Sequence, residues 1–521
     1  MTTRAISGAV LAIFLLAGNA RATLLTKQFQ FGDPVVSGTP WGTIVTVPGC
    51  RSIGNEGEPI LPVYSACFVV PSGEIVMRVS IESLSDVALD GSYDVAPMQA
   101  QAPLGAPAPR AISRDSSIYR SSAAFPAERV FLATEQMIAG LRLAFIDVRP
   151  CAYIPSSGTV LFSSSIRVSV ETAPSSAAVL NAPAARMRKA ARDIRDRVAN
   201  PDLAVEYSAL EEAVTDTTPA SELAQYVIIT SSDFAAAFEP LASLRARFGM
   251  RSRIVDTAWI AANFDGDDEQ EQIRNFIKYA YENWSTQYVL LGGDDDIIPH
   301  RGLYVKNGTY IDIDIPSDLY YACLDGNWNT DGDAYFGEPG EEDLLPEVIV
   351  GRLPVDSIDE IANVIEKISS YELSPVSSQC KSAAMLGELL WSEDSVDTWG
   401  GDYKDEILYG SSSWGFTTAG LPGDFDVTTL YDDDAGSWVG SQVVSLLNEG
   451  VNIVNHCGHS SLFAVMRVTS DDVALFTNDG VEAGYCIIYS HGCYAAAFDN
   501  RDYAGTVYSE DCIGEDLVNS P

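Results

Sequence analysis

Short apolar runs rich in β-branched residues recur along the C-terminal part of the chain. From residue 226 onward they alternate with helical segments, a pattern typical of a parallel sheet covered by helices. We therefore predict an α/β fold here. The predicted strands are 226–230, 288–292, 347–351, 383–387, 451–455 and 486–489, and the clearest helices are 269–282 and 357–371.

The preceding region has a different pattern. In residues 23–175, short β-like runs alternate with Gly and Pro turns and no helical spacers intervene, which predicts an antiparallel all-β domain. Its clearest runs are 42–48, 65–71, 75–81, 141–148 and 166–170. We predict that residues 176–224 form a basic, flexible linker with an exposed helix, followed by two α/β halves at 225–375 and 376–521.

The first 22 residues predict a secretory signal. Arg4 precedes an apolar stretch at 9–17, and Ala20-Arg21-Ala22 fits a small-residue cleavage site. No later run approaches the roughly 20 apolar residues that a membrane helix needs. We therefore expect an exported protein that does not span the membrane.

Charge and cysteine content narrow the function classes. Acidic residues outnumber basic ones 72 to 32, for a formal charge of −40. Such a surface repels nucleic acid and anionic membranes and favours cationic partners, although a solvated acidic surface without a specific partner remains an alternative. Nine cysteines are an odd number in an exported chain, so we expect at least one unpaired thiol.

Two predicted strands are followed by chemically active side chains. His459 follows the strand at 451–455, and Cys493 follows the strand at 486–489. The carboxyl ends of parallel strands are where α/β proteins collect catalytic groups, and an imidazole can take the proton of a thiol. A Cys/His pair is therefore a candidate catalytic dyad. Zinc is an alternative, because His456, Cys457 and His491 are also ligand types, although the spacing fits no zinc motif.

Segments 451–460 and 485–494, with Phe498 and 511–516 downstream, resemble the gingipain-like cysteine peptidase family of the caspase and legumain clan. The resemblance implies a caspase-like catalytic domain of two α/β halves, preceded by an all-β prodomain, in a secreted zymogen that cleaves proteins or peptides. A permanently attached β-domain is the alternative for the prodomain. Catalytic domains of this family continue past the position of Pro521, so we expect that the sequence is either a fragment or that of a shortened protein.

The resemblance also assigns roles to individual residues. It implies His459 as the base, Cys493 as the nucleophile, and the N–H groups of Ser460 and Cys493 as the oxyanion site, although the family usually has Gly where Ser460 stands. Glu388 would orient or assist the histidine. Asp402 would lie at the base of the S1 pocket and select Arg or Lys. The rival hypothesis is a non-catalytic exported binding or surface protein that retains the fold.

The Arg-rich part of the predicted linker, residues 186–197, would be a self-processing site for such an enzyme. A plain solvated linker is an equal alternative.

An Asn/Asp/Gly-rich segment predicts a calcium loop. Oxygen-bearing side chains alternate, Gly332 supplies the tight turn, and a Glu follows six residues later, with Asn in place of the usual first Asp. The predicted ligands are Asn327, Asn329, Asp331, Asp333 and Glu338. We expect structural Ca²⁺ and no cofactor for catalysis; a turn without metal is the alternative. The sequence leaves the oligomeric state open.

Overall fold

The computed structural model describes residues 23–99, 114–175, 182–209, 223–307, 310–393, 396–412, 417–501, 508 and 511–521. The predicted signal at residues 1–22 lies outside these ranges. None of the helices among the described residues has the length and apolar character needed to cross a bilayer.

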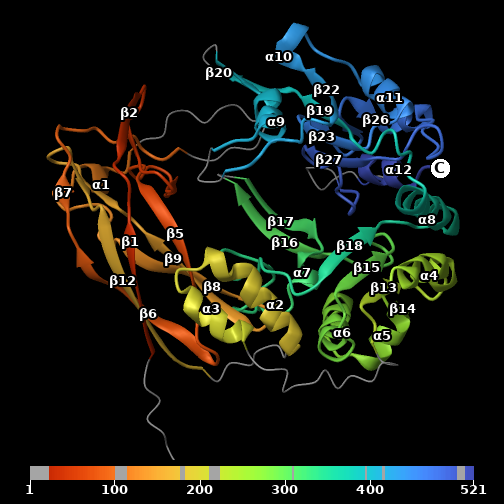
Figure 1. The fold of residues 1–521 in the computed structure, drawn as a ribbon, viewed down its shortest axis with the longest axis horizontal. Coiled ribbons are helices and arrows are strands. Elements are labelled where there is room, and N and C mark those ends of the chain that lie inside the picture. Colours follow the sequence, from red (N-terminus) through yellow and green to blue (C-terminus); the bar gives the residue numbers. More distant parts are fainter. Residues whose placement is uncertain are drawn as a thin grey trace, which may run out of the picture.

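The described part of the N-terminal region is β-rich, as predicted, and contains one four-residue helix (Figure 1). One sheet has the order β1-β12-β6 and another the order β4-β5-β9-β8, all antiparallel, and their facing side chains share a core around Phe68, Ile146 and Ile166. The strands of these sheets are β1 (Thr23–Gln30), β4 (Arg51–Ser52), β5 (Pro62–Val69), β6 (Glu74–Leu84), β8 (Val130–Ile138), β9 (Leu141–Val148) and β12 (Ser165–Pro174). Smaller elements complete the region: β2 (Val35–Thr39), β3 (Gly42–Thr46), β7 (Val87–Ala88), α1 (Ser116–Tyr119), β10 (Cys151–Ile154) and β11 (Thr159–Phe162).

The predicted linker is partly folded. It contains α2 (Ala184–Ile194), the 3₁₀ helix η1 (Arg195–Arg197) and α3 (Pro201–Ser208). Ala191 of α2 is fully buried in a cluster with Leu141 of β9. Arg186 donates to the Ser285 carbonyl at 2.8 Å, and its guanidinium lies 4.5 Å from the centre of the Tyr281 ring. Residues 182–209 are therefore packed against both the N-terminal β region and the first α/β half, which corrects the prediction of a flexible linker with an exposed helix.

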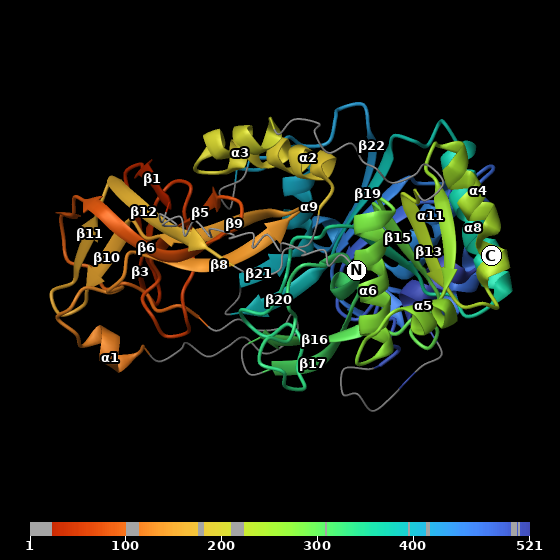
Figure 2. The same cartoon turned by 90° about the horizontal axis from the view of Figure 1, so that it is seen from below.

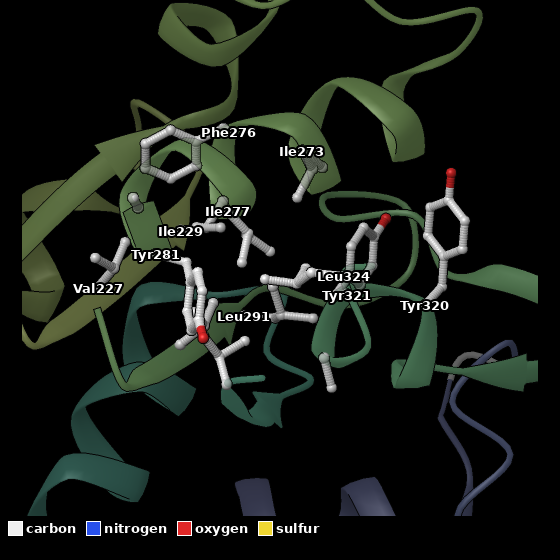
Figure 3. Packing of buried hydrophobic residues seen from close by; sticks show 14 of the residues in the cluster. Val227, Ile229, Ile273, Phe276, Ile277, Tyr281, Leu291, Tyr320, Tyr321 and Leu324 are labelled. Carbon is white, nitrogen blue, oxygen red and sulfur yellow. The ribbon is translucent and has the colours of Figure 1, made fainter. Parts of the chain in front are cut away.

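The first α/β half contains a parallel sheet of order β14-β13-β15-β18. Successive side chains of β13 point to opposite faces. Ile229 packs with α6 around Phe276 (Figure 3). Ile228 packs with α4 and α8 on the other face. The elements are β13 (Tyr226–Thr230), η2 (Ala235–Phe238), α4 (Glu239–Arg247), β14 (Ser252–Asp256), α5 (Thr257–Asn263), α6 (Glu269–Asn283), β15 (Tyr288–Gly292), the hairpin strands β16 (Arg301–Asn307) and β17 (Tyr310–Ser317), α7 (Leu319–Ala322), β18 (Ile349–Leu353) and α8 (Ile358–Leu373).

The second half has a parallel sheet of order β22-β19-β23-β27. Its main elements are β19 (Ser382–Gly387), α9 (Gly400–Tyr409), β22 (Asp426–Tyr431), α11 (Gly440–Glu449), β23 (Ile453–Cys457), β27 (Ile487–His491) and α12 (Ile513–Asn519). Smaller elements are the hairpin β20 (Leu389–Glu393) and β21 (Val396–Trp399), α10 (Asp432–Ala435), the short strands β24 (Ser460–Ser461), β25 (Ala464–Val465) and β26 (Val468–Thr469), and the 3₁₀ helix η4 (Ser470–Leu475). The two sheets confirm the predicted pair of α/β halves.

Strand β23 begins two residues later than predicted. The backbone N–H of Asn452 donates to the Ser382 hydroxyl at 3.0 Å, so sheet pairing of this segment starts only at Ile453. As a consequence, His456 lies inside the strand rather than past its end.

Figures 1 and 2 show the arrangement of these parts. The N-terminal β region lies at one end, and the two α/β halves lie together at the other. In Figure 1, the β16–β17 hairpin of the first half extends toward the second half. The carboxyl ends of β23 and β27 are neighbours in the second sheet, which places the segments that carry His459 and Cys493 side by side.

Candidate active site

His459 lies just beyond the end of β23 and is exposed. Its Nε2 is 3.0 Å from the carbonyl oxygen of Leu389, at the start of β20. A carbonyl only accepts hydrogen bonds, so this contact requires the proton on Nε2. The lone pair is then on Nδ1, which is the form that a general base needs.

Cys493 lies two residues beyond the end of β27, and its side chain is exposed. The hydroxyl of Ser460 donates to the Cys493 carbonyl, although the two residues are 33 positions apart. Gly492 permits this approach, because a Cβ on it would lie 2.2 Å from the Ser460 Oγ. The structure thus brings Ser460, which follows the predicted base, into contact with Cys493, the predicted nucleophile. Ser460, which stands where the family usually has Gly, makes a hydrogen bond that Gly could not make.

Most other cysteines are poor nucleophiles at neutral pH. Burial raises the pKa of Cys50, Cys151 and Cys512 to about 12 and that of Cys67 and Cys486 to about 11. Only Cys493 and Cys380 are exposed thiols.

The zinc hypothesis receives no geometric support. Among the described residues, the groups of three side chains that could hold a metal consist of carboxylates alone. No histidine or cysteine of the two strand-end segments belongs to such a group there.

Glu388 contacts a different histidine from the one expected. Its side chain is 6% exposed, and its Oε1 lies 3.0 Å from Nε2 of His456. The other ring nitrogen of His456 is 2.9 Å from the Ser490 hydroxyl on β27. The hydrogen bond of Glu388 goes to His456 and not to His459, so the expected orienting or assisting role toward His459 stays a prediction. His456 was missed because the predicted strand ended before it.

The segment after Cys493 is held by the first α/β half. The hydroxyls of Tyr494 and Tyr310, on β17, are 2.9 Å apart. Arg501 donates to Asp312 at 3.1 Å and to the Asp314 carbonyl at 2.8 Å. No sequence pattern predicts these contacts, because they join segments almost 190 residues apart.

Asp402 lies in the first turn of α9 and is exposed, whereas a carboxylate at the base of an S1 pocket would be partly buried. Helix α9 begins at the carboxyl edge of the sheet. A Cβ on Gly400 would lie 2.3 Å from the Cys457 carbonyl oxygen, so this helix start packs directly on the end of β23. Asp402 therefore shares the edge of the sheet that carries His459.

The predicted calcium loop is rearranged. Asp331 and Glu338 come together as predicted, and Glu341, which the prediction missed, joins them, with one oxygen of each within 4.8 Å of the others. Asp333 lies outside this group and accepts from the Tyr335 N–H at 2.7 Å. The predicted asparagine ligands are engaged with backbone N–H groups: Asn327 accepts from Asn329, and Asn329 accepts from Gly332. No EF-hand helices flank the loop.

A second carboxylate group lies nearby, formed by Asp325, Asp343 and Glu347. Burial and mutual repulsion raise the pKa of Asp325 to about 7 and that of Glu347 to about 9. A bound cation would relieve this repulsion.

Comparison with known proteins agrees with the geometry. The models of Peptidase family C25 and of its propeptide match residues 220–521 and 38–192, respectively. An uncharacterized protein of Archaeoglobus fulgidus is 25% identical over 308 residues, covering 53% of this chain and 67% of the relative. Lys-gingipain HG66 of Porphyromonas gingivalis is 22% identical, covering 90% of this chain, and Gingipain R2 of Porphyromonas gingivalis (strain ATCC 33277) is 21% identical, covering 86%.

The chain spans only 25% of the length of that Lys-gingipain and 56% of that Gingipain R2. Among solved structures, the Arg-specific cysteine proteinase gingipain R aligns with a TM-score of 0.41 and 19% identity, over 58% of this chain and 60% of its own. The peptidase model covers more than half of the sequence. The chain therefore belongs to peptidase family C25, with the family's propeptide ahead of the peptidase region.

Proposed function

We propose that the protein is a secreted cysteine endopeptidase, made as a zymogen, in which Cys493 and His459 form the catalytic dyad. The observation that carries the proposal is the hydrogen bond from Ser460 to the Cys493 carbonyl, because it joins the segments of both residues. Membership of family C25 supports the reaction class. The rival, a non-catalytic binding protein with this fold, predicts peptide binding without turnover, and a library of fluorogenic peptides separates the two.

The proposed reaction follows from the atoms present. Nδ1 of His459 takes the thiol proton, and Sγ of Cys493 attacks the scissile carbonyl carbon. The N–H groups of Cys493 and Ser460 stabilise the oxyanion. The C–N bond then breaks, and His459 returns the proton to the leaving amine. Water, deprotonated by His459, hydrolyses the thioester and frees the thiol.

We propose that Asp402 selects Arg or Lys at P1. An exposed carboxylate at the edge of the sheet that carries the dyad attracts a cationic side chain, and an exposed charge pair of this kind contributes about 1 kcal/mol. Asp402→Asn should therefore lower kcat/KM about fivefold on Arg and Lys substrates and leave uncharged P1 residues unaffected. Glu406→Gln, one turn further along α9, is the matched control. An unchanged P1 profile would show that other residues line the pocket.

Self-processing near the Arg-rich segment fits this specificity. Arg195 and Arg197 fall between the end of the propeptide match and the start of the peptidase match. Cleavage there would require the short 3₁₀ helix η1 to open.

We propose that Ca²⁺ stabilises the loop that contains Asp331, Glu338 and Glu341. Metal bound only to the native state at a hundredfold excess over Kd adds about 2.7 kcal/mol to the free energy of unfolding. Chelation should therefore lower Tm, and both Asp331→Ala and Glu341→Gln should remove most of that response. Asp333→Asn, outside the group, should keep it. A full chelator response in the first two variants would place the metal at another site.

A further inference from the structure

The backbone of Leu389 is the described partner that orients His459, and a buried carboxylate holds it. Oδ2 of Asp432 accepts from the Leu389 N–H at 2.7 Å, while the Leu389 carbonyl lies 3.0 Å from Nε2 of His459. Asp432 follows directly after strand β22, and its side chain is only 4% exposed. A displacement of Asp432 would therefore move the carbonyl on which the imidazole depends.

Arg467 holds Asp432 in turn. Its Nη2 donates to Oδ2 of Asp432 at 2.7 Å, and its Nε lies 3.6 Å from Oε2 of Glu388. The guanidinium also stacks 4.4 Å from the centre of the Trp438 ring and donates to the Trp438 carbonyl. Arg467 thus lies close to two buried carboxylates, those of Asp432 and Glu388.

The backbone at Arg467 is unusual. Met466 and Arg467 both adopt left-handed conformations, with φ of 54° and 58°, a geometry that non-glycine residues adopt only where their surroundings enforce it. Here the side chain of Arg467 is fixed at several points, and Met466 is fully buried. The left-handed backbone between β25 and β26 therefore directs the guanidinium of Arg467 toward Asp432.

We propose that Asp432 and Arg467 are the positioning residues of His459, acting through the Leu389 backbone. This inference rests on the proposed function. It gives Asp432 the orienting role that the family resemblance suggested for Glu388, whose own hydrogen bond goes to His456. When His459 takes the thiol proton, Nε2–H must stay aligned with the Leu389 carbonyl so that Nδ1 faces the thiol.

Kinetics of Asp432 variants test the inference in the full chain. Asp432→Ala removes the acceptor and the ion pair, and we expect kcat to fall about 100-fold while KM changes less than about twofold. Asp432→Asn keeps an oxygen for the Leu389 N–H and should recover about tenfold of that loss. Asp433→Ala, the adjacent exposed residue, should match the wild type. A loss confined to KM, or wild-type kcat in both Asp432 variants, overturns the proposal.

Imidazole NMR provides a readout that does not depend on turnover. The chain has only four histidines, so His459 can be assigned by comparison with His459→Gln. The wild type and Asp433→Ala should show the Nε2–H tautomer, and Asp432→Ala should show mixed tautomers. If the alanine variant does not fold, Asp432→Asn takes its place with a smaller expected shift. If the nitrogen shifts of His459 are the same in the Asp432 variant as in the wild type, the inference is overturned, whether or not the wild type hydrolyses peptides. If the wild type hydrolyses no peptide, that result by itself rejects only the proposed function.

Discussion

Replacement of Cys493 by alanine is expected to abolish peptide hydrolysis, with kcat falling by about 10⁴-fold or more. The physical reason is that no other cysteine near His459 offers an exposed thiol, since the thiol of Cys457 is buried and burial raises its pKa. The measurement is turnover of fluorogenic peptides by the purified, calcium-loaded protein after release of the propeptide.

Cys380→Ala is the matched control. Cys380 is the other exposed thiol, and it lies just before β19, at the opposite end of that strand from the dyad. We expect this variant to hydrolyse peptides at the wild-type rate. Hydrolysis that survives in Cys493→Ala, or disappears in Cys380→Ala, would rule out the proposed mechanism.

The second large effect is expected at Gly492. An added Cβ there would lie 2.2 Å from the Ser460 Oγ and 2.8 Å from the Ser460 Cβ, so Gly492→Ala must push the Cys493 segment away from the His459 segment. A displacement near 1 Å at a catalytic group costs about 100-fold in rate. We therefore expect a loss of that size in kcat/KM, with little change in Tm because the nucleophile segment is exposed.

Removal of the obstructing side chain should reverse the loss. Ser460→Gly alone keeps the backbone N–H and loses only the hydroxyl contact, so we expect a fall of about threefold. The double variant Ser460→Gly/Gly492→Ala should then recover most of the wild-type rate, since it removes both atoms within 3 Å of the added Cβ and leaves the Ser490 hydroxyl at 3.3 Å. If the losses of kcat/KM in the two single variants add up in the double variant, then Ser460 and the side chain added at residue 492 do not collide.

The sequence predicted the fold well where side-chain pattern alone decides it. The apolar runs of β13, β15 and β19 are buried on both faces, and burial of this kind leaves a continuous apolar signal. Strand ends were less predictable. The apolar run at 451–455 begins at Val451, but a hydrogen bond from the Asn452 N–H to the Ser382 hydroxyl delays the start of strand pairing to Ile453. The periodicity of the sequence does not reveal such a hydrogen bond.

The same limit applies to the candidate site. His459 and Cys493 could be selected because each follows its own strand, which is local information. The residues that hold them could not, because Leu389, Asp432 and Arg467 come from separate segments that only the tertiary fold brings together. Asp402 and Glu388 were proposed from a family register, and a register carries no information about exposure or about which histidine a carboxylate contacts.

Covalent labelling tests the central claim most directly. The folded protein is treated at neutral pH with a limiting amount of a peptidyl chloromethyl ketone, digested, and mapped by mass spectrometry across all nine cysteines. We expect the adduct to be confined to Cys493 and to form much more slowly in His459→Gln. An adduct on Cys380 instead, or labelling of Cys493 at the same rate without His459, would contradict a Cys493–His459 dyad.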